Sequence, residues 1–147
     1  MPQSLVKIIV HMVWSTKDRV RLIPIDIETR LYGYISAIIS NNGGPMIIAG
    51  GDADHIHILV SLGKADMIKL IGDIKRETSK WMKEIGVHKF YWQRGYGAFS
   101  VGQSQVAAVS GYIRDQKEHH KKQVFEDEFR SLCRKYDVEI DERYCWD

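Results

Sequence analysis

The sequence has few of the features that cross-link a small protein or anchor it in a membrane. Its only cysteines, Cys133 and Cys145, lack the CxxC spacing of a zinc knuckle and are too few for a disulfide framework. No apolar run approaches the roughly 18 residues that a membrane span needs. The first residues lack the basic start and long apolar stretch of a secretory signal. We therefore expect a cytoplasmic protein with reduced thiols.

Linkers, repeats and low-complexity tracts are also missing from the 147 residues. With 44% hydrophobic and 27% charged residues, the composition is that of an ordinary globular protein, and a chain of this length can bury a sizeable core. We expect one domain over 1–147, with a core at 5–122 and a C-terminal helix and tail at 123–147.

The charge is unevenly distributed along the chain. Residues 123–147 carry eight acidic and four basic side chains, a net charge of −4. Because the whole chain has a formal net charge of +2, residues 1–122 carry +6. A basic body with an acidic tail is compatible with binding a phosphate backbone, but it also occurs in proteins that never bind DNA.

The hydrophobic pattern alternates between the periods of strands and helices. Strands are expected at 6–14, 46–49, 56–62 and 96–101, the second and third being joined by a turn at 50–54. Helices are expected at 25–42, 65–85, 104–122 with Ser104 as its cap, and 125–136. The order βαββαβ, followed by two helices, predicts an α+β fold: a ferredoxin-like sandwich with an antiparallel sheet and two helices on one face. The other face is left for the last helices, a partner chain or a ligand.

His55 and His57 flank Ile56 on the third expected strand. Successive side chains of a strand alternate between its faces, so both imidazoles project from one side while Ile56 turns to the other. Two such imidazoles can share a metal ion. Two ligands do not make a metal site, however, and a pair of surface or core histidines explains the motif equally well.

Tyr112 and Gln116 lie four residues apart on an expected helix and therefore share one of its faces. Separately they could be a packing tyrosine and a solvated glutamine. Combined with the two histidines, they suggest phosphodiester transesterification: two imidazoles and an amide oxygen hold a divalent ion that polarises the phosphate, and the tyrosine attacks it. The alternative is hydrolysis, which needs a carboxylate to activate water. Asp52 or Asp54 could supply that carboxylate, although both are more typical of a turn.

Several motifs together resemble the single-tyrosine HUH transposases of small insertion sequences, the insertion sequence 200-like family. The resemblance covers nearly the whole chain. It is carried by WSTK at 14–17, DHIHILVS at 54–61, IKRETSKW at 74–81, WQRGYGAFSV at 92–101, YIRDQKEHH at 112–120 and DERY at 141–144.

This resemblance implies the fold expected above and a role for each candidate residue. His55, His57 and Gln116 are expected to bind magnesium or manganese, and Tyr112 to form a 5′-phosphotyrosine link with single-stranded DNA. A dimer that recognises hairpins at element ends is also implied. Related transposases associated with palindromic repeats share the same catalytic set, so the DNA target stays open, as does the use of Tyr112 within one chain or across a dimer.

Other residues are weaker candidates. His11 is expected to be a polar residue of the sheet, with a place beside the histidine pair as the alternative. His119 and His120 are expected to face solvent or DNA, with an approach to the metal as the alternative, because only one of them can share a face with Tyr112 and Gln116. A non-catalytic module that binds single strands is a further alternative, although the aromatic-rich sheet of such modules is missing. Phosphate contacts are expected from Lys75, Arg76, Lys80, Arg94, Arg114 and Lys117.

Overall fold

Four antiparallel strands form the central sheet of the computed structural model, which describes residues 2–147. They are β1 (Ile9–Ser15), β2 (Met46–Asp52), β3 (His55–Ser61) and β4 (Gly97–Val101), in the order β2-β3-β1-β4. The two central strands, β1 and β3, are fully buried. This order is that of a ferredoxin-like sheet and confirms the predicted α+β fold.

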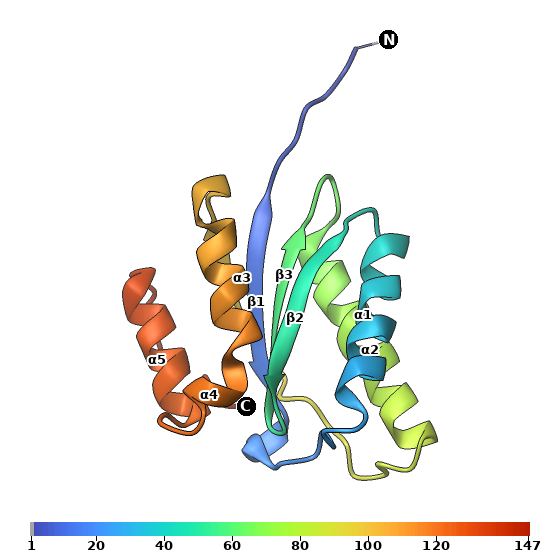
Figure 1. Ribbon diagram of the computed structural model, residues 1–147, viewed down its shortest axis with the longest axis vertical. Coiled ribbons are helices and arrows are strands. Elements are labelled where there is room, and N and C mark those ends of the chain that lie inside the picture. The colour runs from blue at the N-terminus through green and yellow to red at the C-terminus, as the bar shows by residue number, and fades with distance from the viewer. Residues whose placement is uncertain (1) are drawn as a thin grey trace.

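One face of the sheet is covered by α1 (Glu28–Asn41) and α2 (Met67–Glu84), as Figure 1 shows. Asp66 begins α2 as its N-cap, because its side chain accepts a hydrogen bond from the Lys69 backbone. The apolar residues of both helices recur at helical spacing and pack against alternate residues of the strands, including Trp14 and Ile56, which are completely buried. This layer is the main hydrophobic core.

The opposite face is covered by α3 (Val106–Arg114), α4 (Gln116–His119) and α5 (Phe125–Lys135) (Figure 1). Ile113 of α3 packs on Ile9 and Leu59, while Phe125 and Phe129 of α5 pack around Val13 and Phe99 of the sheet. Both faces of the sheet are therefore closed by helices. The last helices occupy the face that the sequence left unassigned.

The helix expected at 104–122 is interrupted. A short 3-10 turn, Gln103–Gln105, precedes α3, and Ser104 makes no capping hydrogen bond. Asp115, with φ −94° and ψ 20°, leaves the helical conformation and separates α3 from α4. The prediction of one continuous helix with Ser104 as its cap was wrong.

Two strand boundaries also differ from the prediction. The first strand begins at Ile9 because its neighbours β3 and β4 end opposite that residue, at Ser61 and Val101. Residues 2–8 extend from the sheet as an arm (Figure 1). The hairpin turn is shorter than expected, since β2 continues to Asp52, which pairs with His55. Another 3-10 turn, Lys17–Arg19, follows β1.

Both cysteines are free thiols, Cys133 buried and Cys145 half-buried. Among the residues that the structure describes, no helix is both long and apolar enough to cross a membrane.

Candidate active site

The strand β3 directs His55 and His57 toward α3, α4 and α5, while Ile56 between them enters the core beneath α1 and α2. Both imidazoles are completely buried. His55 pairs with Ser15 across the sheet, so the site lies at the end of the molecule where β1 ends. Strand alternation therefore accounts for the common direction of the two rings.

Each of these imidazoles has one nitrogen held from behind. Nδ1 of His55 lies 2.7 Å from Oδ1 of Asp54, and Nδ1 of His57 lies 2.8 Å from Nε2 of His11. The other nitrogen of each ring, Nε2, points into the site. Nε2 of His55 lies 2.8 Å from Oε1 of Gln116. The neighbouring groups thus leave both Nε2 atoms facing one centre.

A close approach between α3 and β2 positions the helical half of the site. A Cβ atom on Gly50 would lie 2.3 Å from the carbonyl oxygen of Ile113, so only glycine allows the helix to lie this near the strand. Ile113 is buried in that contact, and the preceding Tyr112 turns its ring toward His57, with the ring centroids 5.8 Å apart. Tyr112 therefore faces the histidine pair of its own chain.

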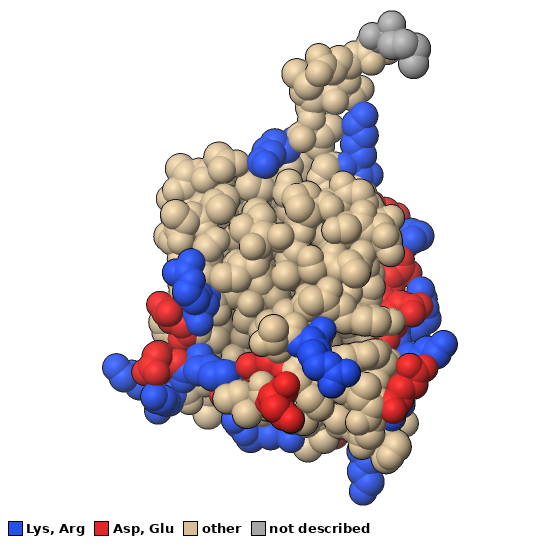
Figure 2. Space-filling view, turned by 45° about the vertical axis from the view of Figure 1, so that its right-hand side comes forward, with Lys and Arg blue, Asp and Glu red and all other residues tan. Residues whose placement is uncertain are grey.

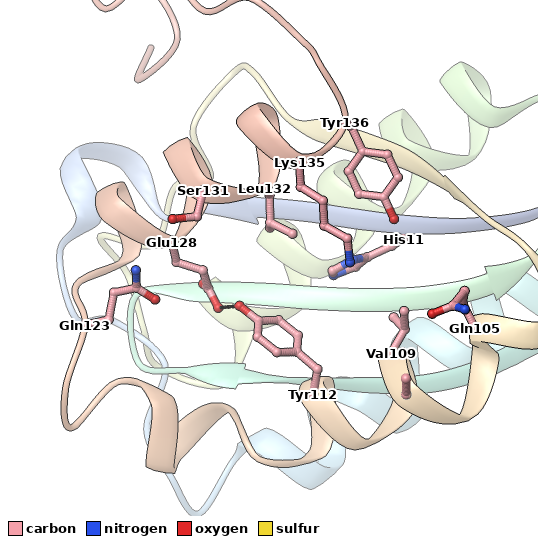
Figure 3. A pocket seen from close by; sticks show the side chains of 11 residues that line it. His11, Gln105, Val109, Tyr112, Gln123, Glu128, Ser131, Leu132, Lys135 and Tyr136 are labelled. Atoms are coloured by element: carbon pink, nitrogen blue, oxygen red, sulfur yellow. Dashed lines mark hydrogen bonds between the residues drawn. The ribbon is translucent and has the colours of Figure 1, made fainter.

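Glu128 of α5 joins these groups and was not among the predicted site residues. Its carboxylate accepts hydrogen bonds from the hydroxyl of Tyr112, as Figure 3 shows, and from Nε2 of Gln116 at 2.9 Å. Its Oε1 lies 3.0 Å from Nε2 of His57 and 3.0 Å from Nε2 of His120. Four side chains of the site thus converge on one carboxylate that is 1% exposed.

A signal for Glu128 was present in the sequence. It lies on the face of α5 that also carries Phe125, Phe129 and Cys133, all of them buried. An acidic residue in that position must be paired or hydrogen-bonded when the helix docks. Its partners come from other elements, however, and no local pattern identifies them.

The structure also changes the interpretation of the remaining histidines. His120 was expected to face solvent or DNA, but its side chain is 6% exposed and bonds to Glu128. It lies one turn after Gln116, as Gln116 does after Tyr112, so the face they share continues across the helix break. The ring of His119 lies 4.7 Å from that of Tyr112. His11 is a buried sheet residue that also contacts the histidine pair, as the alternative reading had it.

Burial and hydrogen bonding set the protonation of the site. Burial opposes ionisation of Glu128, but hydrogen bonds from His120 and His57 outweigh it and hold the pKa of its carboxyl well below the usual range. Burial, with the adjacent Glu128 charge, raises the pKa of Tyr112, so the phenol stays protonated and donates a hydrogen bond to Glu128. Burial and the neighbouring His57 lower the pKa of His11 to about 3, so His11 is neutral.

The donor set fits a divalent metal ion. Ligand atoms of His55, His57 and Glu128 all lie within 4.8 Å of one another, and Oε1 of Gln116 adjoins His55. In metal sites the second nitrogen of a ligating histidine usually donates to a carboxylate or another acceptor. Asp54 provides such a carboxylate, and Nε2 of neutral His11 can accept a hydrogen bond from His57 when Nδ1 of His57 carries the proton. The residues present could therefore hold such an ion.

A cleft of about 290 Å³ between α3 and α5 leads to this centre (Figure 3). Tyr112 and Glu128 lie at its inner end, His11 forms part of its floor, and Lys135 lines its α5 side. A reactant can therefore approach Tyr112 through this cleft, whose lining includes one cation, Lys135, and one anion, Glu128.

Comparison with known proteins identifies the family. The sequence profile of the transposases described as IS200-like matches residues 4–116, which include β1 to α3 and Gln116. The chain belongs to the IS200-like transposases. The resemblance predicted from its motifs is thereby confirmed. No curated protein sequence matches this transposase. Glu128 and the rest of α5 lie beyond the matched residues.

Two solved structures have the same fold. One is a candidate transposase from Deinococcus radiodurans R1, with a TM-score of 0.63 and 19% identity, covering 79% of this chain and 95% of that one. The other is a REP-associated tyrosine transposase bound to a REP hairpin, with a TM-score of 0.62 and 14% identity, covering 82% and 73%. At these identities the likeness establishes the fold alone.

Three of the six cations expected to contact DNA are engaged within the transposase itself, and one of them, Arg76, pairs with Asp73 at 2.8 Å on the surface of α2. The ammonium group of Lys75 donates to the backbone carbonyls of residues 93, 94 and 95 at 2.7–3.0 Å. Lys117 lies 2.6 Å from Glu28 and so fixes α4 against α1. These contacts give both lysines a structural role. The four that are exposed stay candidates for phosphate contacts: Arg76, Lys80, Arg94 and Arg114.

The two signs of charge, which are segregated along the sequence, are mixed on the surface. Figure 2 shows acidic and basic side chains next to each other at the lower end of the molecule, with a broad uncharged area above them. Arg130 of α5, for example, pairs with Glu142 of the tail at 2.7 Å. The acidic tail thus pairs with a cation of α5.

Proposed function

We propose that this transposase cleaves and rejoins single-stranded DNA through a covalent bond between Tyr112 and a 5′-phosphate. One observation carries the proposal: the hydroxyl of Tyr112 and the side chains of His57 and Gln116 meet on the same carboxylate, that of Glu128. A nucleophile, its proton acceptor and candidate metal ligands are therefore within hydrogen-bonding reach of one another, as nucleophilic catalysis requires.

Glu128 is the chain's own acceptor for the phenolic proton; because its lowered pKa makes it a weak base, the proton moves only as the Tyr112 O–P bond forms. Tyr112 attacks the phosphorus, the Tyr112 O–P bond forms, and the bond from phosphorus to the 3′ oxygen breaks. The phenolic proton passes to Glu128, its hydrogen-bond acceptor, and the departing 3′ oxygen takes a proton from water to become a hydroxyl. Attack by another 3′-hydroxyl on the phosphotyrosine reverses these steps and rejoins a strand. Because bond energy is conserved, no nucleotide cofactor is required.

His55, His57, Gln116 and Glu128 would hold the metal ion of this site, which we propose to be magnesium or manganese. When bound, the ion supplies Lewis-acid polarisation of the phosphate and neutralises developing charge. Oxygen donors suit these two metals, and the two imidazoles favour manganese of the pair.

We further propose hairpin-bearing single-stranded DNA as the substrate. The support is membership of the IS200-like transposases and the likeness to a REP-associated transposase solved with a REP hairpin. A homodimer is part of the proposal as well, because the family resemblance implies it. The position of Tyr112 beside His57 of its own chain favours catalysis within one subunit, whatever the assembly.

The test is capture of the covalent intermediate. The transposase is incubated with manganese and labelled hairpin-bearing single-stranded DNA, and a denaturant-resistant protein–DNA adduct is sought. We expect the adduct from the unmodified protein and from Tyr144→Phe, which changes a tyrosine that is 64% exposed, but not from Tyr112→Phe. Adduct formation by Tyr112→Phe would refute the assignment of the nucleophile.

Hydrolysis is a second candidate, because Glu128 supplies the buried carboxylate that water activation requires. In that mechanism Tyr112→Phe still cuts DNA without an adduct, while Glu128→Gln does not cut. If neither the unmodified protein nor any variant cuts DNA that they bind, the alternative of a non-catalytic binding module is favoured.

A further inference from the structure

A second cavity lies at the same end of the sheet as the active site. Its volume is about 590 Å³, and it shares no lining residue with the cleft that leads to Tyr112. Its walls come from the segment after β1, the loop before β4 and the tail that follows α5. Trp92 pairs with Thr16, which directly follows the Ser15 that lies opposite His55. The cavity is therefore next to the catalytic centre and large enough for a small ligand.

Tyr91 offers an aromatic surface to this cavity. It is 54% exposed, although large aromatic side chains are usually buried when they serve only the core. The ammonium group of Lys83 lies 4.1 Å from the centroid of its ring, which orients the ring and leaves its remaining surface open. Exposed tyrosines of this kind stack on unpaired bases irrespective of sequence.

Two cations accompany this ring. Lys17 and Arg94 line the cavity, both are exposed, and within residues 2–147 neither forms an ion pair. Asp18 and Asp147 also line it and would repel an anion. The side-chain charges of the lining thus balance, and a phosphate fits only where it lies beside Lys17 and Arg94 and away from the two carboxylates.

The cavity is built by specific hydrogen bonds. Gln93, which is 3% exposed, accepts from the backbone of Ser15 at 2.8 Å and donates to the carbonyl of Cys145 at 3.2 Å. Gly95 donates to the carbonyl of Asp147 at 2.8 Å. These hydrogen bonds hold the tail in place as one wall of the cavity and connect it to β1, which pairs with His55.

Backbone strain occurs at the same place. Asp18 and Arg19 adopt left-handed conformations, with φ of 57° and 54°, which non-glycine residues rarely do. Arg19 is held there by donating to the carbonyl of Trp146 at 2.9 Å. Such strain is concentrated at binding and catalytic sites, where the surrounding structure maintains it.

The geometry points to a binding site for an unpaired nucleobase of single-stranded DNA, stacked on Tyr91 with its phosphate beside Lys17 and Arg94. This inference rests on the proposed function, since it places a flanking nucleotide of the substrate next to the strand end that carries His55. It adds a base-binding element outside the metal site.

The test measures binding of a labelled oligothymidine without a hairpin, by fluorescence anisotropy in magnesium-free buffer over a range of salt concentrations. Tyr91→Leu should weaken binding about tenfold at every salt concentration, because one stacked base is lost. Lys17→Gln should lower the slope of log affinity against log salt by about 0.7, as expected for one phosphate contact. The two variants thus separate stacking from charge.

Matched controls change the same residue types elsewhere. Tyr144→Leu alters an exposed tyrosine outside the cavity, and Lys64→Gln an exposed lysine that follows β3 at the opposite end of the sheet. Both should bind as the unmodified protein does. The inference is overturned if Tyr91→Leu and Lys17→Gln match these controls, or if the unmodified protein does not bind oligothymidine.

The adduct assay distinguishes this failure from failure of the proposed function. At saturating hairpin DNA, Tyr91→Leu should still form the Tyr112 adduct, because it leaves the catalytic groups in place. Adduct formation without any effect of Tyr91 on oligothymidine binding rejects the base site alone. Stacking on Tyr91 without an adduct from any protein rejects the transesterase while the base site stands.

Discussion

Substitution of Gly50 by alanine should separate the two halves of the active site. The added Cβ would lie 2.3 Å from the carbonyl oxygen of Ile113, whereas ordinary contacts begin at 3.4 Å. The difference of 1.1 Å must be absorbed by β2 or α3. Overpacking of this kind costs about 2 kcal/mol, which for a chain of this size lowers Tm by about 4–8 °C. A displacement of about 1 Å at Tyr112 can reduce the rate about 100-fold.

The assay combines thermal unfolding with the rate of adduct formation on hairpin DNA. Gly33→Ala is the control, since a Cβ there meets nothing within 4 Å and alanine favours the surrounding helix α1 by about 1 kcal/mol. We expect Gly33→Ala to unfold at a slightly higher temperature with an unchanged rate. If Gly50→Ala retains both Tm and the rate of the unmodified protein, the close approach of α3 to β2 does not position Tyr112.

Two further predictions concern Glu128, a proposed metal ligand, and His11, which contacts the proposed ligand His57. Glu128→Gln should weaken manganese binding at least tenfold by calorimetry, because a charged ligand is lost. The pKa of Glu128 is lowered by folding, so its charge stabilises the fold above its usual pKa near 4.5, and this contribution disappears as the pH falls through the lowered value. Urea unfolding should therefore show the stability difference between the unmodified protein and Glu128→Gln shrinking from about pH 6 to about pH 3, and a constant difference would contradict the pairing. His11→Phe removes the partner of His57 Nδ1 and should reduce manganese affinity about 10- to 100-fold, while saturating manganese restores the adduct. Unchanged affinity would mean that another group orients His57.

The parts of this structure that could be predicted depend on local periodicity. Alternation along a strand puts His55 and His57 on one face, and a spacing of four residues puts Tyr112 and Gln116 on another. The order of elements then determines the ferredoxin-like sheet. No pattern within a single element shows that the two faces meet. Gly50, which lets α3 approach β2, was predicted from the sequence to be part of a turn.

Residues whose environment is made by other segments were harder to place. Lys75 occupies the polar face of α2 and was expected to contact phosphates, but the loop at 93–95 folds over it and takes its hydrogen bonds. His120 was expected to face solvent or DNA because only one of His119 and His120 can share a face with Tyr112 and Gln116; His120 does share it, and the docking of α5 buries it against Glu128. Both side chains are polar enough to be exposed to solvent, and only tertiary contacts determine whether they bond to the protein instead.

The energetics of Glu128 explain why α5 belongs to the active site. Removing a carboxylate from water costs several kcal/mol unless hydrogen bonds and opposite charges replace the solvent. Here the replacements are Tyr112, Gln116, His57 and His120, the same groups that the proposed chemistry needs. Docking α5 with its carboxylate buried is therefore possible only when these groups are oriented toward it. In the proposed mechanism, folding of the segment beyond the family match thus orders the proposed nucleophile and metal ligands before DNA binds, which is the preorganisation that electrostatic catalysis requires.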